Sequence, residues 1–419
     1  MKKRIIFGIL IVILLITGSE VRYHMPSFLI RQAKGYINKE SEEKLETSEE
    51  QQLTEEDFLT VSGRDIVNAN GDKINFEGVN IGGWLIQEYW MSPVEGDKDV
   101  KQWTNLETLQ VLEERFGTEK MKELTDIYED NWITEEDIQN IAAKGCNVIR
   151  VPFWYRNFMS YSDGTWIDDN LDKNPGFQKL DWVIEKAGKY GMYVILDMHG
   201  CPGGQSTDHC SGSARKSKLF YSEVKKKAME KLWIEISKRY KDNPTVAAYD
   251  IMNEPETYKG DVESDPRNKL YDRMITAIRK VDKRHIIAVE GIWSLEVLPK
   301  PYETSWDNVI YEVHSYGDNP ENYCDTIEQY SRYYNIPVYI GEFSDMRILE
   351  KCRKLKISYT FWGYKGMING DNRWFMYATN DFTSVDVNND PYWLIKLKWG
   401  KCLRTQYFSA NEEILKYWN

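Results

Sequence analysis

Short apolar runs alternate with longer amphipathic stretches along most of this chain. Short runs rich in Val, Ile and aromatic residues predict β-strands, and stretches with apolar positions three or four apart predict α-helices. The predicted strands are Ile74–Val79, Asn147–Val151, Tyr193–Asp197, Val246–Ile251, Ile286–Val289, Val309–Val313, Val338–Ile340 and Ser358–Phe361. The predicted helices are Glu135–Ala143, Gln178–Tyr190, Ser217–Tyr240, Asp265–Asp282, Asp325–Tyr334 and Asp345–Lys354.

Strands separated by helices predict parallel β–α units, because consecutive parallel strands need a long crossover between them. Eight such units in one uninterrupted region predict an α/β fold, the (β/α)8 barrel. We expect the barrel to occupy residues 59–419 as a single domain. The alternative is an open doubly wound sheet, which usually has a Gly-rich phosphate turn after its first strand. Residues Gly78–Trp84 (GVNIGGW) do not match that turn.

The first 58 residues differ in character from the rest of the chain. Met1–Arg4 is basic, and Ile5–Thr17 is apolar but shorter than the roughly 20 residues of a membrane-spanning helix. This pattern predicts a secretory signal peptide or an uncleaved membrane anchor over residues 1–19. Glu40–Asp57 holds nine acidic residues, so residues 20–58 are expected to form a poorly ordered linker. Both interpretations place the barrel outside the cytoplasm, either secreted or tethered to the cell envelope.

Composition narrows the classes of function. The net charge of −12 argues against a nucleic-acid partner, because such proteins usually carry a basic surface. Fifteen Trp and 27 Tyr supply many aromatic faces, which suit the apolar C–H patches of sugar rings. Six cysteines show no CxxC pair, so neither a zinc site nor another metal or cofactor is predicted. Cys201 and Cys210 flank a Gly-rich loop that a disulfide would staple, whereas Cys146 is expected to be a buried thiol.

Polar and aromatic residues follow six of the eight predicted strands. In a parallel barrel all strands end at the same rim, so these residues should gather there. The residues at the strand ends are Arg150, His199, Asn253 with Glu254, His314 with Tyr316, Glu342, and Trp362.

Glu254 and Glu342 are the most informative of these residues. They follow the predicted strands Val246–Ile251 and Val338–Ile340, where burial of a lone carboxylate would be costly. A pair of carboxylates is the usual requirement for cleaving a glycosidic bond, one as the acid and the other as nucleophile or base. Arg150 near Glu342 should lower the pKa of that carboxyl. Asn253 could donate a hydrogen bond to the sugar 2-hydroxyl.

Seven stretches in a fixed order together resemble glycoside hydrolase family 5, the cellulase-like retaining glycosidases with a (β/α)8 barrel. Gly-Gly-Trp followed by an acidic residue, and His-Gly-x-Pro-Gly-x-Gln, are most similar to the exo-β-1,3-glucanase branch. The stretches are GVNIGGW (78–84), WITEEDIQNIAAKGCNVIRVP (132–152), LDMHGCPGGQ (196–205), DIMNEP (250–255), VHSY (313–316), IGEF (340–343) and FWGYKG (361–366).

The resemblance implies that Glu254 is the acid/base and Glu342 the nucleophile of a retaining glycosidase. It implies that Tyr316 hydrogen-bonds the nucleophile, that Trp362 forms a platform for the sugar, and that Glu88 binds sugar hydroxyls. The other implied supporting residues are Arg150, His199, Asn253 and His314. The implied substrate is a β-linked glucan or oligosaccharide, cleaved as by a glucan β-1,3-glucosidase, with no cofactor. A monomer is expected, although the sequence leaves the oligomeric state open.

Several alternatives stay open at this stage. Within the family, an endo-β-1,4-glucanase or a mannanase is the main alternative, and the sequence fixes neither linkage nor exo or endo action. A metal-dependent hydrolase using His199, His314 and a carboxylate, and a non-catalytic glycan-binding barrel, are more remote. Further aromatic residues are candidates for sugar subsites: Trp293, which follows the fifth strand, and also Trp90, Trp154, Tyr155 and Trp374.

Overall fold

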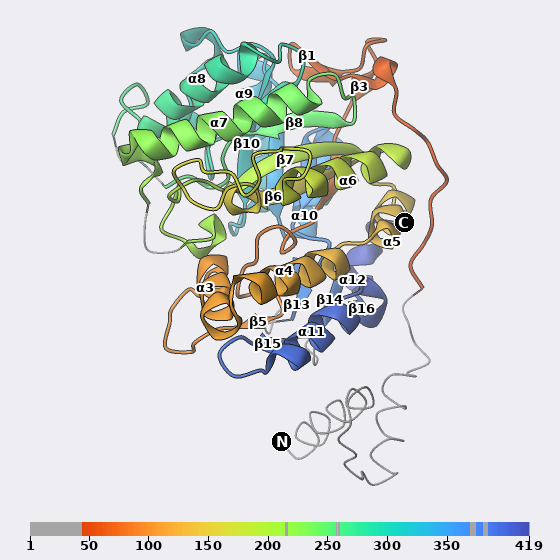
Figure 1. The fold of residues 1–419 in the computed structure, drawn as a ribbon. Coiled ribbons are helices and arrows are strands. Elements are labelled where there is room, and N and C mark those ends of the chain that lie inside the picture. The colour runs from red at the N-terminus through yellow and green to blue at the C-terminus, as the bar shows by residue number, and fades with distance from the viewer. Residues whose placement is uncertain are drawn as a thin grey trace, which may run out of the picture.

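A computed structural model describes residues 44–213, 217–256, 258, 260–368, 374–379 and 384–418. Its centre is a closed barrel of eight parallel strands in the order β10-β11-β12-β4-β6-β7-β8-β9 (Figure 1). The predicted (β/α)8 barrel is therefore confirmed. The barrel strands are β4 (Glu77–Asn80), β6 (Val148–Trp154), β7 (Tyr193–Gly200), β8 (Val246–Asp250), β9 (Ile286–Glu290), β10 (Val309–Ser315), β11 (Val338–Phe343) and β12 (Ser358–Phe361).

Helices cover the outside of the barrel and follow most of the predicted ranges. The match is good because each helix presents a broad apolar face to the strands. The connection between β9 and β10, where no helix was predicted, differs from the helical connections. It contains only two short 3-10 turns, η6 (Leu295–Val297) and η7 (Pro301–Glu303). The predicted helices are observed as α5 (Glu135–Ala143), α6 (Pro175–Lys189), α7 (Glu223–Tyr240), α8 (Pro266–Arg279), α9 (Pro320–Tyr334) and α10 (Met346–Leu355).

Two helices were missed by the sequence analysis, α3 (Asn105–Phe116) and α4 (Thr118–Trp132). Of the α3 residues only Leu112 is a fully buried large apolar side chain, so its apolar periodicity is weak. Its start is nevertheless marked by a capping box, in which Thr104 and Glu107 satisfy each other's backbone N–H groups. That motif was the local signal that would have identified the helix.

A C-terminal group of elements packs with α3 and α4 below the barrel in the view of Figure 1. Tyr128 of α4 packs edge-on against Trp399 of α11, with ring centroids 5.3 Å apart. This group lies beyond the eighth strand in the sequence. Its elements are β13 (Lys365–Met367), β14 (Tyr377–Thr379), β15 (Val385–Asp386), α11 (Tyr392–Lys401), β16 (Ser409–Ala410) and α12 (Glu412–Leu415). Strand β15 pairs with β5 (Val94–Glu95) from earlier in the chain.

The barrel interior changes from apolar to charged along five of the eight strands. Inward residues near the amino ends belong to one apolar cluster, and the residue two positions later is charged on five strands. Side chains alternate between the two faces of a strand, so both members of each pair point inward. The charged layer therefore lies just above a packed apolar floor. The pairs are Val148 and Arg150, Ile195 and Asp197, Ala248 and Asp250, Ala288 and Glu290, and Ile310 and Glu312.

An antiparallel sheet of β1 (Thr60–Ser62), β2 (Asp65–Val67) and β3 (Lys73–Ile74) precedes the barrel. Leu59 and Ile66 join the apolar floor, so this sheet closes the amino end of the barrel. The first predicted strand is thus divided between β3 and β4.

The N-terminal predictions fall partly outside the described residues. Residues 1–43, with the expected signal or anchor segment, are not described and that expectation stays a prediction. From residue 44 onward the acidic segment runs along α5 and α6. Glu46 forms an ion pair with Lys144, and the Gln51 N–H donates a hydrogen bond to the Lys189 carbonyl. Among the described helices none has the length and apolar character needed to cross a bilayer.

Candidate active site

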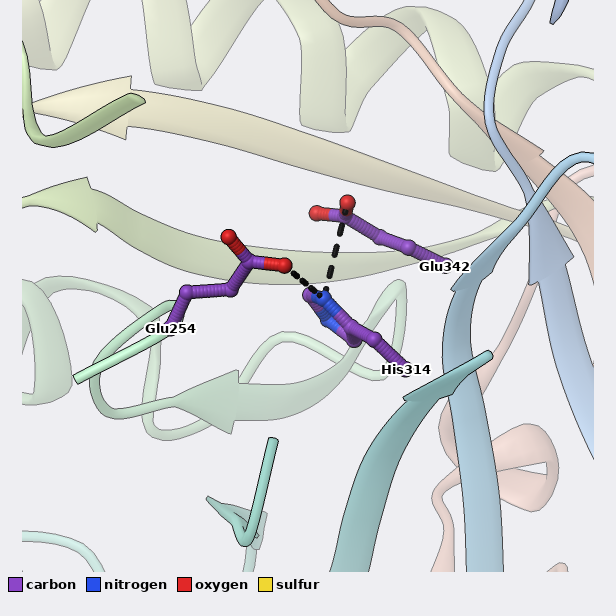
Figure 2. A group of neighbouring side chains, drawn as sticks. All are labelled: Glu254, His314 and Glu342. Atoms are coloured by element: carbon purple, nitrogen blue, oxygen red, sulfur yellow. Dashed lines mark hydrogen bonds and ion pairs between the residues drawn. The ribbon is translucent and has the colours of Figure 1, made fainter. Parts of the chain in front are cut away.

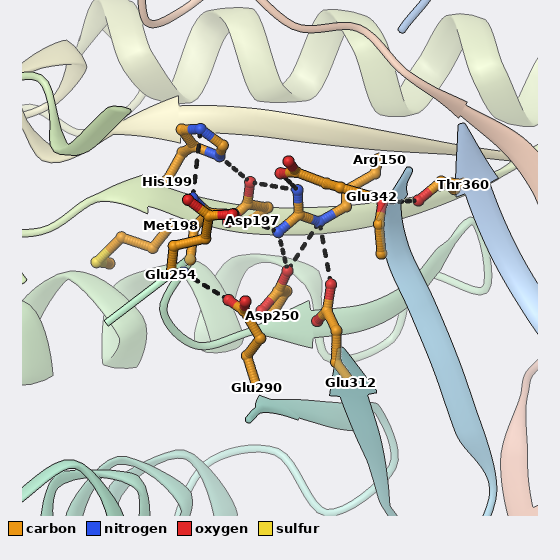
Figure 3. A network of polar contacts seen from close by, with 12 residues as sticks. Arg150, Asp197, Met198, His199, Asp250, Glu254, Glu290, Glu312, Glu342 and Thr360 are labelled. Carbon is orange, nitrogen blue, oxygen red and sulfur yellow. Dashed lines mark hydrogen bonds and ion pairs between the residues drawn. The ribbon is translucent and has the colours of Figure 1, made fainter. Parts of the chain in front are cut away.

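Arg150 lies at the centre of the charged layer and is fully buried (Figure 3). Its guanidinium nitrogens lie 2.7 Å from Asp250 and 3.1 Å from Asp197. They also lie 2.7 Å from Glu342 Oε1. A guanidinium offers five N–H donors in a rigid fork, so this one residue can orient carboxylates from several strands. Asn80 and Asn253 accept two further N–H bonds from Arg150, at 3.1 and 3.0 Å.

The Glu342 carboxylate is held on both oxygens. Oε1 accepts from Arg150 Nη1, and Oε2 accepts from the Tyr316 hydroxyl at 2.9 Å. Arg150 lowers the pKa of Glu342 as expected, but burial outweighs it and the pKa lies above its usual value. The predicted net lowering of this pKa is therefore wrong, because loss of hydration exceeds the attraction of one shared cation.

Among the described residues, no guanidinium or ammonium group contacts Glu254. Its Oε1 lies 2.8 Å from His314 Nδ1, and its Oε2 accepts a weak hydrogen bond from the Cys210 thiol at 3.7 Å. Burial raises the pKa of Glu254 to about 7, and the nearby charge of Glu88 adds to the rise. Of the two carboxyls, Glu254 is thus the one whose surroundings favour a bound proton, while Glu342 has an ion pair to Arg150.

His314 lies between the two carboxyl groups (Figure 2). Its Nδ1 is 2.8 Å from Glu254 and 3.5 Å from Glu342. Burial lowers the pKa of His314 to about 3, so the ring is neutral at physiological pH. One oxygen of each Glu and one ring nitrogen of His314 lie within 4.8 Å of one another. This group has the residue types of a metal site, and His199, a ligand in the metal-hydrolase alternative, is not part of it.

His199 and Glu88 form the side of the site next to β7. His199 Nδ1 contacts Asp197 at 2.7 Å, and its Nε2 faces Glu88 at 3.6 Å. Burial lowers the pKa of His199, but these carboxylates outweigh it and raise the pKa well above its usual value. Glu88 also contacts His209 Nε2 at 3.0 Å and accepts from the Trp90 indole at 2.9 Å. Buried Glu88 and His199 are thus held rigidly at the rim.

The Gly-rich loop after β7 supports the site without a disulfide. Gln205 donates to the carbonyls of His199 and Asn253, at 2.7 and 2.8 Å. Its side-chain oxygen accepts the Cys201 N–H at 3.0 Å. All six cysteines are free thiols, so the expected Cys201–Cys210 disulfide is wrong. Gln205 takes the role of the staple, and the buried Cys210 instead reaches Glu254.

Aromatic side chains surround the opening above the carboxylates. Trp362 stacks on His199 with centroids 5.5 Å apart, and Trp293, 49% exposed, lies 6.2 Å from the Tyr316 ring. Trp374 is 5.3 Å from Tyr316 and packs edge-on against Trp90. Trp154 and Tyr155 are buried and stack edge-on with ring centroids 5.7 Å apart, so their role as sugar platforms stays a prediction.

The ten residues of the predicted site lie together: Arg150 in the charged layer, and around it Glu88, His199, Asn253, Glu254, Trp293, His314, Tyr316, Glu342 and Trp362. The other residues of the charged layer were not predicted as site residues, and neither were Gln205, His209 and Cys210 on the loop. A signal for the deeper layer was present: Glu290 ends the run IIAVE, and Glu312 interrupts the run VIYEV. A carboxyl group inside an apolar strand needs a buried partner or a bound proton. The missed deeper residues are Asp250, Glu290 and Glu312, together with Asn80.

Removing the central cation should destabilise the fold in a pH-dependent way. Arg150→Met should lower the free energy of unfolding by about 3–5 kcal/mol, because buried carboxylates lose their partner. Their pKa values would rise in the folded variant, so the variant should recover stability relative to wild type as the pH falls to about 5. Urea unfolding of wild type and variant at neutral and acidic pH measures this difference in the free energy of unfolding. A difference that is the same at both pH values would contradict the prediction.

A matched control is Arg239→Met. Arg239 pairs with Asp181 in a partly exposed ion pair at 2.6 Å. Solvent screens such a pair, so its loss should cost less than about 1 kcal/mol.

Gly341, the residue before Glu342, is required by close packing. A Cβ at this position would lie 1.7 Å from Glu312 Oε1 and 3.2 Å from His314 Nε2. Gly341→Ala should therefore displace both side chains, cost about 1–3 kcal/mol and lower kcat. Thermal unfolding and steady-state kinetics check this. Gly400→Ala on α11 is the control, because a Cβ there meets only Ile127 at 3.5 Å. This variant should keep wild-type stability and wild-type kcat. Equal losses of stability and kcat in the two variants would contradict the packing argument.

The chain also matches the sequence model of a known protein family. The cellulase model of glycoside hydrolase family 5 matches residues 94–381. The chain belongs to glycoside hydrolase family 5. The resemblance seen in the sequence motifs is thereby confirmed, and the matched range includes both Glu254 and Glu342.

Curated relatives of this family 5 chain have several names. It is 30% identical over 271 residues to a "Beta-xylosidase" of Phanerodontia chrysosporium, covering 62% of the chain and 52% of that protein. It is 29% identical over 246 residues to a "Probable glucan 1,3-beta-glucosidase A" of Aspergillus fumigatus, covering 57% and 55%. It is 27% identical over 282 residues to a "Probable glucan endo-1,6-beta-glucosidase B" of Aspergillus flavus, covering 62% and 68%. The chain spans about half the length of the first two relatives.

Solved structures share the fold at lower identity. A rutinosidase from Aspergillus niger superposes with a TM-score of 0.54 at 16% identity, covering 82% of this chain and 98% of the other. An endogalactoceramidase gives a TM-score of 0.55 at 18% identity, covering 74% and 75%. These matches support the barrel architecture alone.

Proposed function

We propose that this protein is a retaining glycoside hydrolase in which Glu342 is the nucleophile and Glu254 the acid/base. The observation that carries the proposal is the spacing of their carboxyl groups, which approach within 4.8 Å. Retaining enzymes hold the two groups about 5–5.5 Å apart, whereas inverting enzymes need about 6.5–9.5 Å to admit a water between them. Family membership supports the same reaction class.

In the first step Glu342 attacks the anomeric carbon and forms a covalent glycosyl–enzyme ester. The bond from that carbon to the leaving oxygen breaks, and Glu254 gives its proton to this oxygen. In the second step Glu254 takes a proton from a water molecule whose oxygen attacks the anomeric carbon. The ester bond to Glu342 breaks, and the sugar leaves with its original anomeric configuration.

The surroundings of the two carboxyls suit these different tasks. Arg150 and Tyr316 bind Glu342 on different oxygens, which stabilises its ionised form and aims it at the substrate. Glu254 rests against a neutral imidazole and a thiol, which leaves its proton available. His199 and Glu88 offer an imidazole and a carboxyl group to sugar hydroxyls, and Trp362 offers an apolar face.

We infer that the substrate is a β-glucan or a β-linked gluco-oligosaccharide, with glucan β-1,3-glucosidase-like cleavage. Relatives named as glucan glucosidases and the ring of aromatic side chains favour it. Product analysis on laminarin, pustulan, carboxymethylcellulose and mannan tests this. Glucose released from laminarin with retained configuration is the expected result. Cleavage of only carboxymethylcellulose or mannan would replace it with the endo-β-1,4-glucanase or mannanase alternative.

We also propose that the enzyme acts outside the cytoplasm, because a β-glucan is an extracellular or envelope polymer. The basic and apolar start of the chain, Met1–Thr17, supports secretion or tethering. Fractionation of cells expressing the full chain tests it: activity in the medium or envelope is expected, and activity confined to the cytosol would contradict it.

A further inference from the structure

Four carboxyl groups form a buried row beneath the rim, on the neighbouring strands β7 to β10 (Figure 3). Asp197 lies opposite Asp250 across the β7–β8 pair, and Glu290 lies opposite Glu312 across the β9–β10 pair. Each of the four is at most 1% exposed. Such a row is expensive unless its members are paired with cations or protonated.

Among the described residues, cations lie closer to the Asp197 and Asp250 end of this row than to the Glu290 and Glu312 end. Arg150 contacts Asp197 and Asp250 closely, and His199 adds a second contact to Asp197. Glu312 lies 3.6 Å from Arg150, and no cation lies against Glu290 among the described residues. Burial, together with the charges of Glu254 and Asp250, raises the pKa of Glu290 well above its usual value, and burial does the same for Glu312. The surroundings of both side chains therefore favour the protonated form.

Glu290 makes two contacts with the catalytic layer above it. Its Oε2 accepts the backbone N–H of Glu254 at 2.5 Å. Glu254 has a φ of +39°, a backbone conformation that non-glycine residues rarely adopt and that needs outside support. The other oxygen, Oε1, faces His314 Nε2 at 3.5 Å. Neither Glu290 Oε1 nor His314 Nε2 has a hydrogen-bond partner elsewhere in the described part of the chain.

His314 thus connects Glu290 below with Glu254 above. Its Nδ1 faces Glu254 at 2.8 Å, while its Nε2 faces Glu290 at 3.5 Å and Glu312 at 3.7 Å. A neutral imidazole has one N–H donor and one acceptor nitrogen, so the group next to Nε2 decides what Nδ1 presents to Glu254. A protonated Glu290 can donate toward Nε2, which leaves the Nδ1–H group as the donor to Glu254 Oε1.

We propose that Glu290 is a positioning residue for acid/base catalysis: as a neutral carboxylic acid it fixes the backbone of Glu254 and, through His314, the hydrogen bond made to its carboxyl. The inference rests on the proposed role of Glu254. It predicts that Glu290 matters for the proton transfer to the leaving group rather than for attack by Glu342. A glutamine at position 290 keeps an acceptor for the Glu254 N–H and a donor for His314, whereas a leucine keeps neither.

The experiment compares Glu290→Leu and Glu290→Gln on two aryl β-glucosides with the full chain. One substrate has a dinitrophenolate leaving group, which departs without a proton, and the other has a methylumbelliferone leaving group, which needs one. Glu254→Ala is measured alongside. Glu129→Gln is the matched control, because Glu129 on α4 is also buried, its pKa is raised to about 7 by burial, and it lies outside the site.

Glu290→Leu should lower glycosylation (kcat/KM) with the methylumbelliferyl substrate by about 10²-fold, the usual contribution of general acid catalysis, and with the dinitrophenyl substrate far less. Glu290→Gln should restore most of the rate. In Glu290→Gln, the apparent pKa of the alkaline limb of kcat/KM should stay within about half a pH unit of the wild-type value, because the replaced group carries no charge. Glu129→Gln should change neither substrate.

Two results would overturn the proposal. An equal loss on both substrates in Glu290→Leu would indicate a general structural role. A downward shift of the alkaline limb by more than about one unit in Glu290→Gln would mean that Glu290 is ionised in the working enzyme. The second result needs only the glutamine variant and is decisive even if the leucine variant does not fold. If Glu254→Ala also lacked the leaving-group dependence, the assignment of Glu254 would fail, and that outcome is separate from both.

Discussion

Glu342→Gln should reduce kcat by about 10⁴-fold or more, because an amide does not form the glycosyl–enzyme ester. The variant should still bind laminari-oligosaccharides, since Arg150, His199 and the aromatic residues remain. It should also stay folded: burial raises the pKa of Glu342 above its usual value, so the folded state tolerates the charge less well than the unfolded chain does, and removal of the charge should not cost stability. Steady-state kinetics, isothermal titration with laminari-oligosaccharides and thermal unfolding give the three readouts.

Glu129→Gln serves as the control for this loss, because it neutralises a buried carboxyl on α4 without touching the site. It should keep wild-type kcat. A Glu342→Gln protein with substantial turnover, measured after exclusion of contaminating wild-type enzyme, would remove Glu342 from the role of nucleophile.

Glu254→Ala should show losses that depend on the leaving group. With a methylumbelliferyl glycoside the formation of the glycosyl–enzyme should slow by about 10²–10⁴-fold, because no acid protonates the departing oxygen. With a dinitrophenyl glycoside that step needs no proton, and the glycosyl–enzyme should accumulate because the general base is missing. Added azide should then raise kcat and yield a β-glycosyl azide. Equal losses with both leaving groups and no effect of azide would contradict the role of Glu254.

The same assignment predicts the pH dependence of the wild-type enzyme. Glu254 must carry a proton to act as the acid, and burial raises its pKa to about 7. The value of kcat/KM should therefore fall as the pH rises through about 7, and this alkaline limb should disappear in Glu254→Ala with an activated substrate. A limb that persists unchanged in the variant would belong to another group.

Much of the fold was predictable because its signals are local and repeated. Strand β10, for example, is a short run rich in β-branched residues, Val309–Ser315. Helix α5 has an apolar face, and its observed bounds are the predicted ones, Glu135–Ala143. The rim residues were also predictable, because parallel strands place their carboxyl ends together. Glu254 and Glu342 are 88 positions apart in the sequence, yet this topology alone brings their side chains to one opening.

The remainder depends on contacts between distant segments. The strand order predicted that Arg150 lies near Glu342. It did not predict that burial raises the pKa of this carboxyl by more than Arg150 lowers it. Cys201 and Cys210 were expected to form a disulfide in the loop, whereas Gln205 holds the loop and Cys210 reaches Glu254.

The most direct test of the account is to trap the intermediate on the wild-type enzyme. A 2-deoxy-2-fluoro-β-glucoside with a dinitrophenolate leaving group forms the ester quickly but hydrolyses slowly, so the enzyme should lose activity with time. Digestion and mass spectrometry should then find one fluoroglucosyl group on the peptide containing Gly341, Glu342 and Phe343, with Glu342 as the modified residue. A label on another residue, or an unlabelled enzyme that releases sugar with inverted configuration, would contradict the proposed mechanism.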